Sequence, residues 1–337
     1  MLQRTIDTAR FLRSDPIRTA RSGRTPHRTI FTQGKSSLRY FPVPEGQTVN
    51  CPPVLISMPL INTWTVWDLL PGRSVVEGLT GAGVPVYLVD WGRAGPEDAH
   101  RPLSWYLDDV LNRLVDRAER HAAVHCGGSK LDAIGYCVGG TFLAIHASRN
   151  PERFRQAAFV CTPIDFHKSG RLATWANPET FPLDAIVAGP RNFDGWRMAD
   201  SFAWLRPAGA TRKWMSLWER IDRDDFPELW AALEKWSRDA VDFPGLAYRE
   251  YVRQCYFDNA LIAGGWVLGT QTVDLQRAKI PALAITADGD HIAPTESCAA
   301  LADAWGGSVE VQTIAGGHVG VSIGSALPAA LVAWSGR

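Results

Sequence analysis

The sequence lacks the segments that would direct it to export or into a membrane. Its first 40 residues are rich in arginine but hold no apolar core of the signal-peptide kind, so we expect no secretory signal. No apolar run elsewhere reaches the length of a membrane span. The formal net charge is zero, which gives no overall argument for nucleic acid or an anionic surface as a partner. We therefore expect no transmembrane segment and no nucleic-acid partner.

The six cysteines lack the spacing of a disulfide framework or of a zinc site. None belongs to a C-x-x-C pair, and they lie at positions 51, 126, 137, 161, 255 and 298. Reduced thiols fit a cytoplasmic protein best, and we expect neither a metal nor another cofactor. The sequence also has no internal repeat and no low-complexity tract.

What the sequence does have is an alternation of apolar, strand-like segments with helical ones over most of its 337 residues. Strands are predicted at 53–58, 84–91, 131–134, 157–162, 282–287 and 309–314. Helices are predicted at 74–82, 103–124 and 141–147, and from residues 296 and 326 onward. The segments 29–32 and 38–41 predict a hairpin at the edge of the sheet. This alternation indicates an α/β protein with a mostly parallel central sheet flanked by helices.

The alternation stops between residues 165 and 274, which we interpret as an inserted, Trp-rich helical cap. Half of the 14 tryptophans lie between residues 165 and 250. Residues 26–164 would then form the first part of the core, and residues 275–337 the second part. Residues 1–25 are expected to be a basic, flexible and solvated extension. Their arginines also fit a transit peptide or an arm that contacts a granule or an acidic partner.

The stretch 135–140, with the sequence Gly-Tyr-Cys-Val-Gly-Gly, joins a predicted strand to a predicted helix. A Gly-x-Cys-x-Gly turn in this place has the layout of a nucleophile elbow, with Cys where lipases carry Ser. Gly135 and Gly139 would leave room for the tight turn, and the helix amides would favour a thiolate on Cys137. The alternative is a small apolar Cys at the start of a Gly-rich helix.

Acyl transfer by a thiol also needs a base, and the sequence supplies candidates in the order typical of α/β-hydrolases. Asp290 follows the predicted strand 282–287, and His318 follows the predicted strand 309–314. Both would lie at the C-terminal edge of the sheet, where Cys137 also lies. Asp288 is an alternative acid, and His291 is an alternative base.

The oxyanion of such a reaction would be bound by two backbone amides. One would belong to Val138, directly after the nucleophile. The other would come from the loop after the strand 53–58, where Leu60, Ile61 and Asn62 are the candidates. Cys161 and Cys298 are interpreted as apolar packing residues.

These motifs resemble those of the catalytic subunits of polyhydroxyalkanoate (PHA) synthases, from about Thr25 to the end of the chain. The matching stretches are 59–62, Leu69 with 71–74, 86–92, 135–141, 162–166, 290–294 and 316–320. The combination of Gly-x-Cys-x-Gly-Gly with Asp-His-Ile-x-Pro and Gly-His is specific, because a plain lipase would carry Ser at the elbow. The chain length and the Gly-Gly-His-Val-Gly motif resemble the short synthases, which work with a second subunit. The Cys-Val-Gly-Gly motif resembles the long ones.

The resemblance implies an α/β-hydrolase fold with a mobile cap, and polymerisation of (R)-3-hydroxyacyl-CoA with release of CoA. Cys137 would hold the growing polyester as a thioester, and His318 would deprotonate Cys137. Asp290 would either help to deprotonate the monomer's hydroxyl or orient His318. The implied partners are the CoA thioester, the polyester chain or granule, a second synthase subunit and further copies in a homo-oligomer.

Two other functions stay open on the residues alone. One is a Cys-dependent intracellular polyester depolymerase or thioesterase of the same fold. The other is a non-enzymatic homologue that binds granules or regulates a partner. The intact set of Cys137, Asp290 and His318 argues against the second, because a homologue without catalysis has no chemical need for all three.

Overall fold

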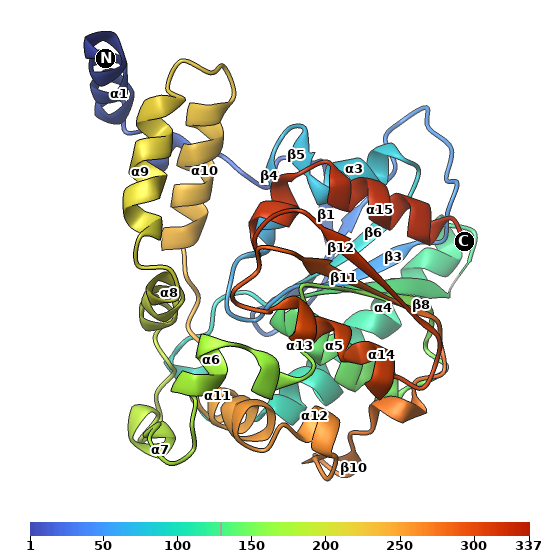
Figure 1. Cartoon of the computed structure of the whole chain (residues 1–337). Helices are drawn as coiled ribbons and strands as arrows, with labels where there is room; N and C mark the ends of the chain where they lie inside the picture. Colours follow the sequence, from blue (N-terminus) through green and yellow to red (C-terminus); the bar gives the residue numbers. More distant parts are fainter. Residues whose placement is uncertain (129) are drawn as a thin grey trace.

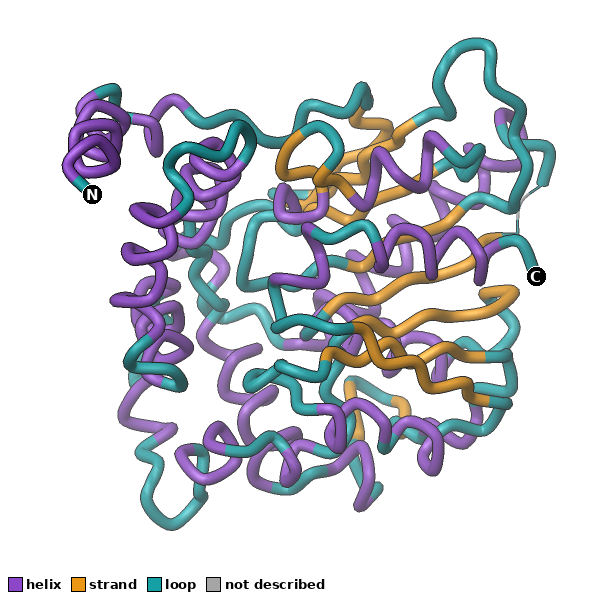
Figure 2. The backbone as a smooth tube through the Cα atoms, turned by 45° about the horizontal axis from the view of Figure 1, so that its top comes forward, coloured by secondary structure: helices purple, strands orange, loops and turns teal. Residues whose placement is uncertain are grey.

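The computed structural model describes residues 1–128 and 130–337, and an eight-stranded sheet lies at its centre (Figures 1 and 2). In spatial order its strands are β1 (Arg28–Gln33), β2 (Ser36–Phe41), β6 (Val86–Asp90), β3 (Val54–Ser57), β7 (Leu131–Tyr136), β8 (Phe154–Val160), β11 (Ala282–Ala287) and β12 (Val309–Ile314). The pairs β1–β2 and β2–β6 are antiparallel, and every later pair is parallel. The predicted edge hairpin and the mostly parallel sheet are confirmed.

The composition of the strands explains which of them lie inside. Every residue of β3 and of β7 is buried, as near-continuous apolar runs require in a parallel sheet that is covered on both faces. The edge strands β1 and β12 instead expose several of their residues. The ends of the six predicted strands differ from the observed ends by at most three residues. β11 and β12 coincide with their predicted ranges.

Helices cover both faces of this sheet (Figure 1). α3 (Val75–Gly81) and α15 (Ala326–Ser335) lie together on one face, and α4 (Asn112–His125) and α5 (Val138–Arg149) lie on the other. The predicted helix 103–124 begins as a π-helix, Trp105–Leu111, and continues as α4. Further elements include α13 (Thr295–Ala299), α14 (Leu301–Ala304), and the hairpins β4 (Asp68–Leu70) with β5 (Arg73–Ser74) and β9 (Val267–Leu268) with β10 (Gln271–Thr272). None of the helices in the described ranges is both long and apolar enough to cross a membrane.

Between β8 and β11 the chain leaves the sheet and forms a helical layer beside the core (Figure 1). The helices of this layer are α6 (Arg171–Trp175), α7 (Leu183–Ile186), α8 (Gly195–Trp204), α9 (Gly209–Glu219), α10 (Phe226–Arg238), α11 (Gly245–Tyr251), a π-helical segment (Val252–Phe257) and α12 (Ala260–Ala263). The tryptophans in the layer differ in their surroundings. Trp230 is buried, whereas Trp196 and Trp204 are 60% and 67% exposed.

The first 20 residues form α1 (Leu2–Arg13) and α2 (Pro16–Thr19), which pack against α9 and α10 of this layer (Figure 1). Phe11 packs edge-on against Trp230, with 6.5 Å between the ring centroids, and Ile17 joins the same cluster. The amide and the hydroxyl of Thr25 then donate to the Asp68 carboxylate of the core, at 2.8 and 2.6 Å. The expectation of a solvated extension did not foresee this contact, because the apolar residues that make it are dispersed among the arginines.

Candidate active site

The candidate catalytic residues lie at the carboxyl ends of adjacent strands. β7, β8, β11 and β12 are parallel neighbours, so the loops that follow them meet at one edge of the sheet. Cys137 follows β7 directly, Asp290 lies three residues past β11, and His318 lies four residues past β12. The topology therefore brings together three side chains that are far apart in the sequence.

The turn at Cys137 has a backbone conformation that L residues rarely adopt. Its φ is 53° and its ψ is −130°, and such strain costs on the order of 1–3 kcal/mol. Hydrogen bonds hold the turn in place. The Cys137 amide donates to the Val160 carbonyl at 3.0 Å, and the Cys137 carbonyl accepts from the amides of Gly140 and Thr141 at 2.9 and 3.2 Å. Cys137 is thereby fixed directly before the first turn of α5.

The glycines of the turn are needed because other backbone lies very close to them. A Cβ on Gly135 would lie 2.3 Å from the Gly140 Cα. A Cβ on Gly139 would lie 2.3 Å from the carbonyl oxygen of Ser57. Both positions behave as the sequence predicted. Gly140 is a third such position, since its Cβ would lie 1.9 Å from the hydroxyl oxygen of Thr162.

Asp290 and His318 are joined by a short hydrogen bond between His318 Nδ1 and Asp290 Oδ2, at 2.6 Å. The other carboxylate oxygen of Asp290 accepts from the amides of Ile292 and Ala293, at 2.8 and 2.9 Å. The Asp290 side chain is 0% exposed, and that of His318 is 7% exposed. Burial raises the pKa of Asp290, but the charge of His318 and these hydrogen bonds outweigh it and hold that pKa below its usual value. Both oxygens of this carboxylate are thus engaged with donors of the protein.

The protonation of His318 depends on the same neighbours. Burial lowers the pKa of His318, but the negative charges of Cys137 and Asp290 outweigh this effect and raise the pKa to about 10. Cys137 therefore lies close enough to interact electrostatically with the imidazole. Tyr136 fixes the ring in place, since its hydroxyl donates to the His318 carbonyl at 3.0 Å and its own ring stacks on the imidazole. The His318 ring is thus held beside Cys137.

The two alternative candidates have other contacts. The Asp288 carboxylate accepts from the Gly316 amide at 2.8 Å, which ties together the loops that carry Asp290 and His318. His291 is not bonded to Asp290. Within the described ranges its Nδ1 is buried without a hydrogen-bond partner. The structure thus pairs the acid Asp290 with His318.

The predicted oxyanion donors also lie at this edge. Val138 is the first residue of α5, and the first amides of a helix have no partner inside it. Ile61 and Val138 both line an apolar cavity of about 350 Å³ between the core and α8, whose further walls include Phe181, Phe193 and Tyr256. Asn62 is only partly buried and does not line this cavity. An apolar cavity that reaches Val138, the neighbour of Cys137, suits an acyl chain.

Cys161 is closer to the site than its sequence context suggested. It follows β8, and its thiol, an oxygen of Asp290 and a ring nitrogen of His318 all lie within 4.8 Å of one another. Like Cys137, it has a positive φ, of 46°. Burial, followed by the charge of Asp290, raises the pKa of this thiol well above its usual range. Cys161 is therefore a neutral thiol packed beside the acid and the base.

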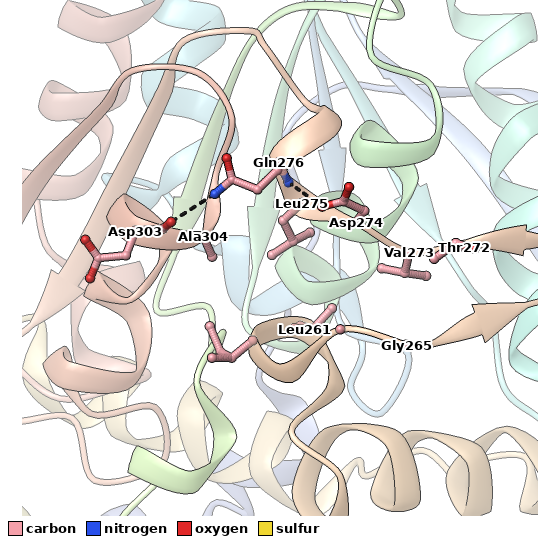
Figure 3. A pocket seen from close by; sticks show the side chains of 11 residues that line it. Leu261, Gly265, Thr272, Val273, Asp274, Leu275, Gln276, Asp303 and Ala304 are labelled. Carbon is pink, nitrogen blue, oxygen red and sulfur yellow. Dashed lines mark hydrogen bonds between the residues drawn. The ribbon is translucent and has the colours of Figure 1, made fainter.

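Figure 3 shows a different pocket, of about 420 Å³, between α12, the segment Leu275–Arg277 and α14. Its polar groups bond to one another. The Gln276 side chain donates to the Asp303 carbonyl, and the Gln276 amide donates to the Asp274 carboxylate, both at 3.0 Å. Its lining contains no Cys, Ser or His side chain, and none of its residues belongs to the Cys137 cluster. The edge with Cys137 is therefore the better candidate for chemistry.

Comparison with known proteins supports this fold and shows the family to which the chain belongs. The sequence profile of the "alpha/beta hydrolase fold" matches residues 66–324. The poly(3-hydroxyalkanoate) polymerase subunit PhaC of Allochromatium vinosum is 31% identical over 90% of this chain and 84% of its own length. The corresponding subunit of Synechocystis sp. is 30% identical over 93% and 84%. This chain belongs to the poly(3-hydroxyalkanoate) polymerase family.

Members of this polymerase family are acyltransferases, and they differ in length. The polymerase subunit of Haloferax mediterranei is 28% identical, and the match covers 93% of this chain but 63% of that protein. Solved structures support the fold alone. A hydrolase from Pseudomonas aeruginosa superposes with a TM-score of 0.55 at 17% identity, over 94% of this chain and 100% of its own. The esterase Est1E from Butyrivibrio proteoclasticus gives 0.52 at 15% identity, over 91% and 96%.

Proposed function

We propose that this polymerase-family chain joins (R)-3-hydroxyacyl units from CoA thioesters into a polyester, with Cys137 as the nucleophile. The observation that carries the proposal is the buried Asp290–His318 pair beside a cysteine in a strained elbow. In this proposal the Cys137 thiolate attacks the thioester carbonyl, and CoA leaves as a thiol after taking a proton from His318. The acyl group then remains on Cys137 as a thioester.

Elongation requires that a hydroxyl, and not water, accepts the acyl chain. In our proposal His318 takes the proton of a 3-hydroxyl group, and that oxygen attacks an acyl thioester. The C–S bond of the thioester then breaks, and the departing sulfur takes the proton back from His318. Asp290 acts by orienting His318, because its carboxylate is inaccessible and both of its oxygens already accept protein hydrogen bonds. The amides of Val138 and of Ile61 or Asn62 would stabilise the oxyanion.

The apolar cavity beside Val138 supports transfer to a hydroxyl, since it offers the acyl chain a surface that water wets poorly. We assign the role of a cap to residues 165–274, between core parts 26–164 and 275–337, with residues 1–25 docked on the cap. Granule association, a homo-oligomer and a second synthase subunit belong to the same proposal. They rest on family membership.

The alternative is a thioesterase or depolymerase with the same Cys137 chemistry, in which water accepts the acyl group. The two functions differ in their products. Purified protein with (R)-3-hydroxybutyryl-CoA should release CoA and accumulate polymer, measured as crotonic acid after acid digestion of the insoluble fraction. Free 3-hydroxybutyrate in amounts equal to the CoA released, with no insoluble product, would exclude polymerisation.

A further inference from the structure

A second cavity lies beside the loops that carry Asp290 and His318. It is a groove of about 1030 Å³ between the cap helices α8–α10 and the core. His291, next to Asp290, and Val319, next to His318, both line it. Ile61 and Val138 line the apolar cavity instead, and Phe202 of α8 lines both spaces. α8 therefore separates two approaches, one on the nucleophile side and one on the side of the acid and the base.

The lining of the groove has more positively charged side chains than negatively charged ones. Its lining has five Lys or Arg side chains and three carboxylates. Two of these carboxylates are already paired, Asp225 with Arg73 and Glu234 with Lys213. The other three cations are Arg206, Arg220 and Arg223, and none of them has a carboxylate within 4.0 Å among the residues that the structure describes. Asp200 is the remaining acid of the groove.

These three arginines lie at the two ends of α9. Arg206 precedes the helix and donates to the Gly289 carbonyl at 3.2 Å, beside the loop of the catalytic acid. Arg220 and Arg223 follow its C-terminal end. Since α9 has 11 residues, the two ends are about 16 Å apart. The ion pair between Arg73 and Asp225, at 2.8 Å, holds the far end against the core.

We propose that this groove binds the CoA portion of the thioester, with its phosphates at Arg220 and Arg223 and its thiol end beside Arg206 and His318. The inference rests on the proposed function, which makes CoA the leaving group. CoA is a long thiol with phosphate groups at the far end, and arginine is the residue best suited to bind phosphate oxygens. The arrangement also places the departing sulfur on the side of His318, the group that returns its proton.

The first test compares two thioesters of (R)-3-hydroxybutyrate, one with CoA and one with N-acetylcysteamine, which has no phosphate. In Arg220→Gln/Arg223→Gln, the ratio of kcat/KM for the CoA thioester to kcat/KM for the short thioester should fall about tenfold or more, mainly through KM. Arg212→Gln is the matched control. Arg212 lies on α9, bonds only to the Ala208 carbonyl and does not line the groove. An unchanged ratio in the double variant, or an equal fall in the control, would overturn the proposal.

A binding measurement separates this inference from the proposed function. Cys137→Ala cannot form an acyl-enzyme, so the affinities of CoA and of phosphate-free pantetheine can be measured from the fluorescence of the groove tryptophans, such as Trp204 and Trp236. CoA should bind more tightly than pantetheine, and Arg220→Gln/Arg223→Gln should remove the difference. Equal affinities of Cys137→Ala for CoA and for pantetheine would refute the proposed CoA site. If CoA binding depends on the arginines but the wild-type protein yields only free hydroxy acid, polymerisation is refuted and the proposed CoA site is supported.

Discussion

Asp290→Asn tests how the acid works, because the Asp290 carboxylate accepts three hydrogen bonds and an amide offers only one oxygen. Two donors, the amides of Ile292 and Ala293, reach Oδ1, and His318 Nδ1 reaches Oδ2. The favourable orientation of the asparagine keeps its oxygen on the two amides and turns its NH2 group toward His318. Nδ1 must then accept a hydrogen bond, so the proton moves to the other ring nitrogen, which can no longer take a proton from Cys137.

We expect this tautomer change to slow acylation of Cys137 by about 10³–10⁴-fold, the size that loss of the correct tautomer has in a catalytic triad. The assay is a single turnover with excess enzyme, in which rapid quenching and chromatography follow CoA release. Asp288→Asn is the control, since an asparagine oxygen can still accept from the Gly316 amide that Asp288 bonds now. Normal acylation with slow elongation in Asp290→Asn would show instead that the carboxylate acts on the monomer's hydroxyl.

Three further predictions concern the elbow, the base and the thiols. Gly139→Ala should lower the free energy of unfolding by about 3 kcal/mol or more, because the new Cβ would clash with the Ser57 carbonyl. Gly81→Ala, whose Cβ would have no described atom within 4 Å, should raise the free energy of unfolding by at most about 1 kcal/mol. Urea denaturation measures both, and similar effects of the two variants would contradict the packing argument. The pKa of His318 is raised from 6.5 to about 10, so its stabilising charge is fully present below pH 6.5 and is lost toward pH 10. The stability advantage of wild type over His318→Gln should shrink across that range, and an advantage that grows would contradict the assignment. Three other buried thiols, those of Cys161, Cys255 and Cys298, have pKa values that burial raises. Iodoacetamide at pH 7 should label Cys137 before these three, and uniform labelling would count against an activated cysteine.

The parallel sheet and the elbow could be predicted from the sequence because their signals are local. Apolar strand segments and the glycines around Cys137 are adjacent in the chain, and strand order then places Asp290 and His318 at the same edge. The position of Cys161 beside Asp290 and His318 could not be predicted from such local signals. Its approach to Asp290 depends on the register of β8 between β7 and β11 and on a left-handed backbone conformation.

The contacts of the helical layer between β8 and β11 could not be predicted for a similar reason. Arg206 bonds to Gly289, 83 residues away, and Phe11 reaches Trp230 from the other end of the chain. Such pairs follow no periodic pattern, and the tryptophans show only that the region is apolar. The separation of an apolar cavity from an arginine-lined groove is therefore a property of the folded chain.

The central claim is that Cys137 carries a growing polyester, and mass spectrometry of the acylated peptide tests it most directly. Wild-type protein quenched in acid during turnover of (R)-3-hydroxybutyryl-CoA should yield a peptide containing Cys137 with a ladder of masses separated by one hydroxybutyryl unit. A single acyl unit that disappears as free hydroxy acid accumulates, or a ladder on a residue other than Cys137, would contradict the account.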